Sequence, residues 1–543
     1  MAERILRGRP ASPGLAIGPL VRLPKVMLSL GPGQGGHPLA GGDIDPAGEA
    51  AQLQTALDRA HAELEALIAG ADEIGAEILE FQLELLDDPA LTGEAKARIA
   101  DGSSALWAWH DVLRRQIMSY EDAEDEYFRA RASDLQDVET RVRRALGGTQ
   151  DRVGPLLPGA VVLDDDLTPS GFLSLDWTVL GGIALERGSP SAHVAMLARA
   201  RGVPMATNLG EVPETGEAVL DAEEGLLVVR PEAATRARYL GRLDQRRREA
   251  AEATALITRP AVTAGGERVE VMLNVDDPAA VGDDILGAAD GVGLFRTEFL
   301  FIGRDRLPDE SEQLQTYARL LDRLHGKPCI VRTLDIGGDK PLPGLALPAE
   351  ANPFLGLRGL RLCLERPELF RPQVRALLQA AVHRPLKVML PMVATAEEYG
   401  EACAFFAACL AELEREGRQA AMPPLGIMVE TPAAALTVDL IPAEFFSIGS
   451  NDLTQYVMAA SRDGEGRVGA LNDPLQPAVL RLIGQVARHG EAVGVPVSLC
   501  GDMASDPKGV AALLGLGLRR LSVAPAALGR VKQAIARFGM NDT

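Results

Sequence analysis

The chain has 543 residues, of which 47% are hydrophobic, 24% charged and 4% aromatic, and its formal net charge is −21. This length exceeds what one hydrophobic core supports, so we expect about two to four domains. The acidic charge and the scarcity of aromatic residues exclude a nucleic-acid partner, because a phosphate backbone would be repelled and bases would find few stacking surfaces.

Membrane insertion and disulfide bonding are not expected either. No apolar run reaches the roughly 18 residues of a membrane span, and the first ten residues lack the apolar core of a signal peptide. The five cysteines are odd in number and show no CxxC spacing, so neither disulfides nor a zinc site is indicated. We therefore expect a soluble cytoplasmic protein.

Residues 43–146 form long amphipathic patterns with almost no strand signal, and they predict an antiparallel helical subdomain. This span holds 24 acidic and 10 basic residues, a net charge of 24 − 10 = 14 negative charges. Helices often carry solvated acidic faces. The concentration of charge in one subdomain nevertheless favours the docking of a basic partner.

The flanking segments predict a small α/β domain. Residues 147–230 contain short apolar strands broken by glycines, and the strand-like residues 1–42 are expected to join the same sheet. The helical subdomain would then be an insertion. Residues 231–260 are charged and rich in alanine, which predicts a helical linker.

His193 is the candidate nucleophile of this α/β domain. Ser189 followed by Pro190 predicts a helix start with Ser189 as the N-cap, which places His193 in the first turn. The positive end of the helix dipole disfavours imidazole protonation and would stabilise a phosphoryl group carried on the ring. The other six histidines are expected to be ordinary surface residues.

The remaining residues, 261–543, contain eight short apolar runs separated by segments of helix length. Eight strands alternating with helices over about 280 residues predict a (β/α)₈ barrel of the TIM type. A doubly wound open sheet could also gather strand-end residues, but the count of eight favours the barrel.

Two of these runs end on carboxylates, Glu430 and Asp452. The carboxyl ends of parallel strands are where α/β folds build active sites. Two adjacent carboxylates repel each other unless a cation joins them, and oxygen ligands with spare water positions suit Mg²⁺ bound to a phosphorylated substrate.

Other polar residues follow the same strand ends. The candidate anion-binding residues are Arg296, Arg332, Arg358 and Arg462, since guanidinium groups match phosphate and carboxylate geometry. Cys500 follows the seventh run, and a thiol there could deliver a proton to carbon. Buried structural cysteine is the alternative interpretation.

Long stretches of the chain resemble one known family. The matching segments are SPGLAIG, DEYFRARASDLQDVETRVRRALGG, DLTPS, SAHVAMLARARGVP, GVGLFRTEFLF, VRTLDIGGDKPLP, NPFLGLRGLR, MVETPAAA, FSIGSNDLTQY and LCGD. Together they closely resemble Enzyme I, the phosphoenolpyruvate-protein phosphotransferase of the bacterial sugar phosphotransferase system, a family of phosphoenolpyruvate-utilising enzymes.

The resemblance implies a specific reaction. His193 would take the phosphoryl group of phosphoenolpyruvate and pass it to a histidine of a small phosphocarrier protein (HPr or a paralogue) docked on the helical subdomain. Mg²⁺ would be held by Glu430 and Asp452, and Cys500 would protonate enolpyruvate. Substrate would be bound by Arg296, Arg332, Arg358, Asn451, Asp452 and Arg462. A homodimer through the barrel is also expected.

The chain departs from the family pattern at several positions. Ala192 and Val194 replace two hydroxyl residues beside the active histidine, whereas Thr168 still matches and could supply one hydroxyl. Asp502 replaces a glutamate, and Gln82 stands where a histidine is common. We interpret the chain as a divergent but active member with its own phosphocarrier.

Two other functions stay open at this point. The chain could be a regulatory phosphorelay paralogue that signals through its phosphorylation state. It could also be a barrel enzyme that acts on phosphoenolpyruvate or pyruvate without protein phosphotransfer, although His193 would then have no purpose.

Overall fold

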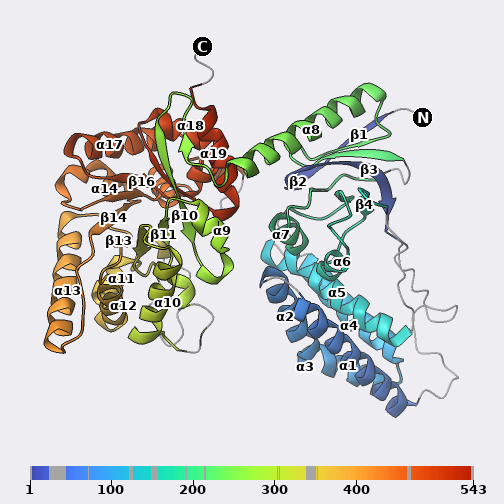
Figure 1. Cartoon of the computed structure of the whole chain (residues 1–543). Helices are drawn as coiled ribbons and strands as arrows, with labels where there is room; N and C mark the ends of the chain where they lie inside the picture. Colours follow the sequence, from blue (N-terminus) through green and yellow to red (C-terminus); the bar gives the residue numbers. More distant parts are fainter. Residues whose placement is uncertain are drawn as a thin grey trace. The chain divides into compact units, whose positions relative to one another are not determined.

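The structure is a computed structural model that divides into two compact units, Met1–Arg246 and Arg247–Thr543 (Figure 1). The structure describes residues 3–23, 45–70, 73–121, 126–147, 157–190, 192–212, 216–301, 304, 306–337, 350, 352–461 and 466–539.

The first unit contains a subdomain of five helices. These are α1 (Pro46–Gly70), α2 (Glu73–Asp87), α3 (Pro89–Ala100), α4 (Ala105–Glu121) and α5 (Glu126–Gly147). Leucine and alanine recur at helical spacing along α1, and Leu53, Leu57 and Leu64 are buried together with Trp109 of α4. Asp88 accepts a hydrogen bond from the N–H of Ala90 and caps α3.

The rest of the first unit is an α/β domain built on one eight-stranded sheet. Its strands are β1 (Arg4–Arg7), β2 (Arg9–Ser12), β3 (Leu15–Arg22), β4 (Val161–Asp164), β5 (Gly182–Leu185), β6 (Met205–Thr207), β7 (Glu217–Asp221) and β8 (Leu226–Val229). The strand order is β1-β8-β7-β3-β4-β5-β6-β2. The opening segment therefore joins the sheet, as its sequence predicts.

Parallel pairing within this sheet is confined to β3, β4, β5 and β6. Two short helices follow these parallel strands, α6 (Pro169–Leu173) after β4 and α7 (His193–Ala200) after β5. Apolar residues of α6 and α7 pack on one face of the sheet, among them Phe172, Val194 and Leu197. The two helices thus lie at the edge where parallel strands end.

The predicted linker is a continuous helix, α8 (Ala233–Leu256). Its first half belongs to the first unit, where Tyr239 packs against β7 and β8 and Arg242 pairs with Asp221. Its second half belongs to the second unit, where Gln533 donates hydrogen bonds to Glu249 and Glu252.

The second unit is a closed barrel of eight parallel strands. The strands are β10 (Arg268–Val275), β11 (Val292–Phe295), β12 (Cys329–Arg332), β13 (Leu386–Leu390), β14 (Leu425–Val429), β15 (Phe446–Ile448), β16 (Val497–Leu499) and β17 (Arg520–Val523). Pairing of β10 with both β17 and β11 closes the sheet. A short strand, β9 (Ala261–Val262), runs antiparallel to β10.

Helices and 3-10 turns surround the barrel. The α-helices are α9 (Asp283–Ala288), α10 (Glu310–Arg323), α11 (Leu360–Glu365), α12 (Pro367–Ala380), α13 (Ala396–Arg415), α14 (Pro432–Leu436), α15 (Ser450–Met458), α16 (Gly466–Gly469), α17 (Pro477–Val493), α18 (Pro507–Gly515) and α19 (Leu528–Arg537). The 3-10 turns are η1 (Pro278–Ala280), η2 (Glu298–Leu300), η3 (Pro353–Leu355), η4 (Val438–Leu440), η5 (Asp502–Ser505) and η6 (Pro525–Ala527).

Alternation along the strands separates two apolar layers of the barrel. One set of strand residues packs with the helices in the large outer core. The other set forms a smaller buried cluster that includes Leu294, Met389, Met428 and Cys500. All eight predicted runs are strands of this barrel, so the predicted fold class is confirmed.

None of the helices in the described part of the chain is long and apolar enough to cross a membrane.

Candidate active site

Most of the predicted site residues of the second unit lie at the carboxyl ends of the barrel strands. Arg332 is the last residue of β12, Glu430 follows β14, and Cys500 follows β16. Asn451 and Asp452 lie in the first turn of α15, directly after β15. A parallel barrel brings these ends to one rim, which is the active-site face of this fold.

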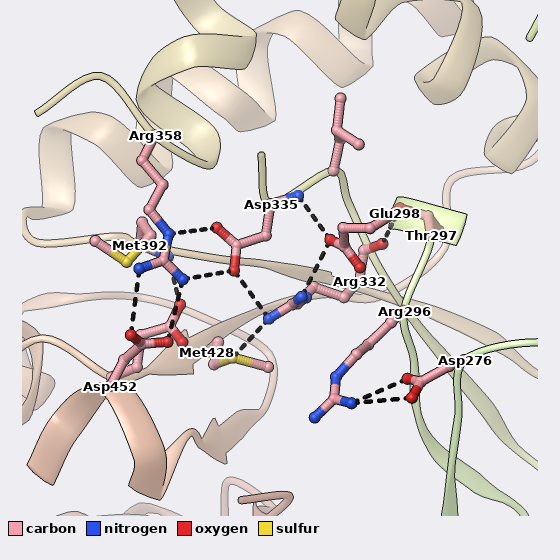
Figure 2. A network of polar contacts seen from close by, with 12 residues as sticks. Asp276, Arg296, Thr297, Glu298, Arg332, Asp335, Arg358, Met392, Met428 and Asp452 are labelled. Atoms are coloured by element: carbon pink, nitrogen blue, oxygen red, sulfur yellow. Dashed lines mark hydrogen bonds and ion pairs between the residues drawn. The ribbon is translucent and has the colours of Figure 1, made fainter. Parts of the chain in front are cut away.

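Arg332 is buried between two carboxylates (Figure 2). One terminal nitrogen lies 3.0 Å from Glu298 Oε1 and the other lies 3.0 Å from Asp335 Oδ2. Burial opposes the positive charge, but Glu298, Asp335 and Glu430 outweigh it and raise the pKa of Arg332. The guanidinium is therefore permanently charged and held in one orientation.

Arg358 lies between Asp335 and Asp452 (Figure 2). Its Nε donates to Asp335 at 3.0 Å, and its terminal nitrogens donate to both oxygens of Asp452 at 3.2 Å. The guanidinium thus forms one bidentate pair with Asp335 and another with Asp452, and the second pair fixes the Asp452 carboxylate. In this arrangement Arg358 contacts carboxylates of the protein on both sides.

Glu430 is almost completely buried, at 1% exposure. Its Oε1 accepts a hydrogen bond of 2.7 Å from the backbone N–H of Met392. Met392 has a φ of 59°, a left-handed conformation that is strained for a residue with a side chain. In this conformation the Met392 N–H reaches Glu430. Burial first, and then the charges of Asp452 and Asp335, raise the pKa of Glu430 well above its usual range.

Arg296 and Asn451 lie in more open positions of the same rim. The Arg296 guanidinium pairs with Asp276 at 3.0 Å and is one-third exposed (Figure 2). Asn451 donates to Asp502 at 2.8 Å and accepts from the Asp502 N–H at 2.9 Å. Asp502, whose side chain is shorter than the glutamate that it replaces, therefore orients Asn451. Arg462 lies outside the described residues.

The Cys500 thiol is buried, and its Sγ lies 3.6 Å from the carbonyl oxygen of Ile448. Burial raises the pKa of the Cys500 thiol to about 11, although a hydrogen bond with Ser447 opposes this shift. The group therefore keeps its proton at neutral pH. A group that holds a proton is suited to donate one.

His193 is the first residue of α7, but the predicted helix start is wrong. The Ala192 N–H donates a hydrogen bond of 3.1 Å to the Ser189 carbonyl oxygen. Helix α7 begins at His193, and Ala192 is its N-cap without a capping side chain. The imidazole still lies at the positive end of the helix dipole.

The His193 ring also contacts the helical subdomain. Its Nδ1 lies 2.9 Å from Oδ2 of Asp134, a residue of α5 with no exposed side-chain surface. Thr168 is the N-cap of α6, where its hydroxyl accepts a hydrogen bond from Gly171. Ala192 and Val194 are buried in the apolar core around α6 and α7.

Comparison with known proteins agrees with this architecture. Residues 250–540 match the model of the PEP-binding domain of PEP-utilising enzymes, residues 7–131 match their N-terminal domain, and residues 156–225 match their mobile domain. The chain belongs to the PEP-utilising enzyme family.

Curated relatives extend over most of this PEP-utilising enzyme. A phosphoenolpyruvate-protein phosphotransferase of Priestia megaterium is 38% identical over 91% of the chain and 88% of the relative. One from Geobacillus stearothermophilus is 38% identical over 96% of the chain and 91% of the relative. A multiphosphoryl transfer protein of Rhodobacter capsulatus is 39% identical over 99% of the chain and 64% of the relative.

The charges around the barrel rim fit a divalent cation. Within the buried network, two guanidinium groups face four carboxylates, those of Glu298, Asp335, Glu430 and Asp452. The excess of two negative charges is consistent with the raised pKa of Glu430. No group of three or more His, Cys, Asp or Glu spaced to hold a metal ion occurs among the described residues. A carboxylate pair suits Mg²⁺, which is commonly held by one or two carboxylates together with substrate phosphates and water.

Three carboxylates that contact predicted site residues are not predicted as functional residues from the sequence. Asp335 lies three positions after Arg332, the last residue of β12, and Glu298 follows Arg296 by two positions. Asp134 lies in an amphipathic helix, where an acidic residue normally faces solvent. For Glu298 the available signal was its place directly after a barrel strand. For Asp134 there was no signal in the sequence.

Proposed function

We propose that this chain transfers the phosphoryl group of phosphoenolpyruvate to His193 and then to a histidine of a small phosphocarrier protein. The observation that carries the proposal is the buried rim network of Arg332, Arg358, Glu430 and Asp452 in a chain that also presents His193 at a helix start. Relatives of similar length are named phosphoenolpyruvate-protein phosphotransferases, which supports this reaction.

The barrel residues would bind the substrate by charge. The guanidinium groups of Arg296 and Arg332 suit the phosphate and carboxylate of phosphoenolpyruvate, because a planar fork pairs with either group. Asn451 would contribute an amide donor and Arg462 a further guanidinium, and Arg358, which also pairs with Asp335 and Asp452, would add positive charge. Preorganised charges around the transferring group are the main source of rate enhancement in phosphoryl transfer.

Glu430 and Asp452 would hold Mg²⁺. When bound, this ion neutralises charge on the phosphoryl oxygens. The two carboxylates orient it, since Met392 fixes Glu430 and Arg358 fixes Asp452.

The transfer itself breaks one bond and forms another. A lone pair of the His193 imidazole forms the N–P bond while the bond between phosphorus and the enol oxygen breaks. The enolate of pyruvate leaves and takes a proton from Cys500 at its methylene carbon, which gives pyruvate. The thiolate then regains a proton from water.

The domain division follows from this scheme. We propose residues 1–42 and 147–230 as the phosphohistidine domain, 43–146 as the phosphocarrier-binding subdomain, 231–260 as the linker and 261–543 as the phosphoenolpyruvate-binding barrel. The acidic helical subdomain would dock a basic face of the phosphocarrier. We further propose a cytoplasmic homodimer that associates through the barrel.

Labelling with phosphoenolpyruvate radiolabelled in its phosphoryl group tests the proposal. In the presence of Mg²⁺ the intact chain should acquire label that is stable in base and labile in acid. His193→Ala should abolish the label. His383→Asn is the control, because His383 is exposed and asparagine tolerates its left-handed backbone. Label that persists in His193→Ala would overturn the proposal.

A further inference from the structure

The His193 ring contacts a buried carboxylate of the helical subdomain, that of Asp134. His193 Nδ1 and Asp134 Oδ2 lie 2.9 Å apart, and the two side chains are 12% and 0% exposed. Neither atom has a hydrogen-bond partner with good geometry among the described residues. The 2.9 Å distance lies within the range of charge-assisted contacts.

Gln82 of α2 supports this carboxylate from behind. Its amide nitrogen lies 3.5 Å from Asp134 Oδ1 and donates to Asp137 Oδ2 at 3.1 Å. Asp137 Oδ2 also accepts from the backbone N–H of Ser170 at 2.9 Å. Because both neighbours of the amide are carboxylates, only its nitrogen can face them, and the orientation of Gln82 is fixed.

The neighbours of His193 in sequence offer no side-chain alternative. The side chain of Ala192 accepts no hydrogen bond from the first N–H groups of α7. Both Ala192 and Val194 are buried in apolar surroundings. Hydroxyl groups that could bind the ring are therefore missing from both sides. Among the described residues, the sequence around His193 is complemented by a contact from another subdomain, that of Asp134 with the ring.

We propose that Asp134, held in place by Gln82, is a positioning residue that keeps the proton of His193 on Nδ1 and leaves Nε2 as the nucleophilic nitrogen. The assignment of Nε2 as the phosphorylated atom rests on the proposed function, whereas the tautomer does not. Gln82 can do this at any pH because an amide does not titrate. The pair ties the helical subdomain to the helix that carries the nucleophile.

The nitrogen shifts of His193 in the full chain, labelled with ¹⁵N-histidine and measured without substrate, test the tautomer. We expect the Nδ1–H form to dominate. In Asp134→Asn, Gln82 holds the amide oxygen and turns the amide NH₂ toward His193. The ring nitrogen must then accept, and the Nε2–H form should dominate.

A double variant isolates the contribution of Gln82. In Gln82→Met with Asp134→Asn the amide is free to turn, so the Nδ1–H form should recover in part. Gln54→Met with Asp134→Asn is the control, because Gln54 lies on the exposed face of α1. An unchanged tautomer in Asp134→Asn, or no difference between the two double variants, would overturn the proposal.

A kinetic measurement separates this inference from the reaction itself. In Asp134→Asn the initial rate of His193 labelling should fall about 10-fold or more, since the nucleophilic nitrogen is protonated. The KM for phosphoenolpyruvate should be unchanged because the barrel is untouched. Normal labelling in a variant whose tautomer has switched contradicts the positioning role. Absence of labelling in the unaltered chain contradicts the proposed function instead, and leaves the tautomer result standing.

Discussion

At the scale of single residues, Arg358 has two opposing effects on the proposed metal position. It orients the Asp452 carboxylate, but its positive charge also competes with any cation for the same oxygens. Burial, and then the charges of Asp452 and Asp335, raise the pKa of Glu430 in the same network. The affinity for a cation is therefore set by Arg358 as well as by the carboxylates.

Arg358→Met should bind Mn²⁺ alone more tightly than the unaltered chain, because a competing charge is removed. The rate of His193 labelling should nevertheless fall about 100-fold, since Asp452 loses its orientation. Titration of Mn²⁺ by electron paramagnetic resonance measures the first effect, and Arg358→Lys serves as the charge-preserving control. Weaker Mn²⁺ binding in Arg358→Met would show that orientation, not charge, dominates.

Cys500 differs from most buried cysteines in its place at the active rim. Because burial raises its pKa to about 11, the protonated form persists throughout the neutral range and is lost only as pH rises through that value. Protonation of enolpyruvate should thus be independent of pH between about 6 and 9.

Cys500→Ala should still label His193, but the proton should reach the methylene carbon from both faces. The configuration of the chiral methyl group of pyruvate, formed in D₂O from phosphoenolpyruvate that carries tritium stereospecifically at its methylene carbon, measures this. Serine at the same position is the isosteric control without a comparable acid. Retained stereospecificity in Cys500→Ala would exclude the thiol as the proton donor.

At the scale of elements, the sequence predicts the barrel well because each strand is an apolar run of characteristic length. Burial on both faces makes β14 a continuous apolar segment that stops at Glu430. The opening strands were also predictable, since β3 alternates apolar and small residues that pack in the sheet. These signals arise from residues that are neighbours in the chain, so they can be detected in a single sequence.

Contacts across elements were not predictable. The sequence predicts the start of α7 too early because Ser189 and Pro190 suit a turn as well as a helix start, whereas the helix begins at His193. The pairing of Arg358 with Asp335 and Asp452 joins the segment after β12, which carries both Asp335 and Arg358, to α15, which follows β15. The contact between Asp134 and His193 joins residues 59 positions apart, 193 − 134, in different subdomains.

Lys532 of α19 stabilises the end of α8. Its ammonium group is buried and donates to the carbonyl oxygens of Ile257, Arg259 and Ala288 at 2.6 to 2.9 Å. Two of these carbonyls belong to the segment that directly follows the helix. Without the ammonium group, these three carbonyl oxygens would lose a buried hydrogen-bond donor.

Lys532→Met should lower the stability of the barrel by about 2–4 kcal/mol, because buried acceptors are left unsatisfied. The midpoint of the corresponding transition in thermal denaturation of the full chain measures this. Lys508→Met on the exposed surface of α18 is the matched control and should change little. Equal midpoints for the two variants would show that Lys532 is not a capping residue.

At the scale of the whole molecule, the proposed nucleophile and the proposed substrate site belong to different units of the chain. Helix α8 contains the division between Arg246 and Arg247 and makes separate contacts within each unit. Transfer from phosphoenolpyruvate to His193 requires that the two units approach each other, and departure to a phosphocarrier requires that they separate. We expect this motion to act through α8.

The most direct test of this divided site combines binding and turnover in His193→Ala. Calorimetry with Mg²⁺ should show that the variant binds phosphoenolpyruvate as tightly as the unaltered chain, because the substrate site lies in the barrel. Rapid-quench measurement should find no stoichiometric burst of pyruvate from the variant, whereas the unaltered chain releases one equivalent. Loss of phosphoenolpyruvate binding, or a retained pyruvate burst, in His193→Ala would contradict the account.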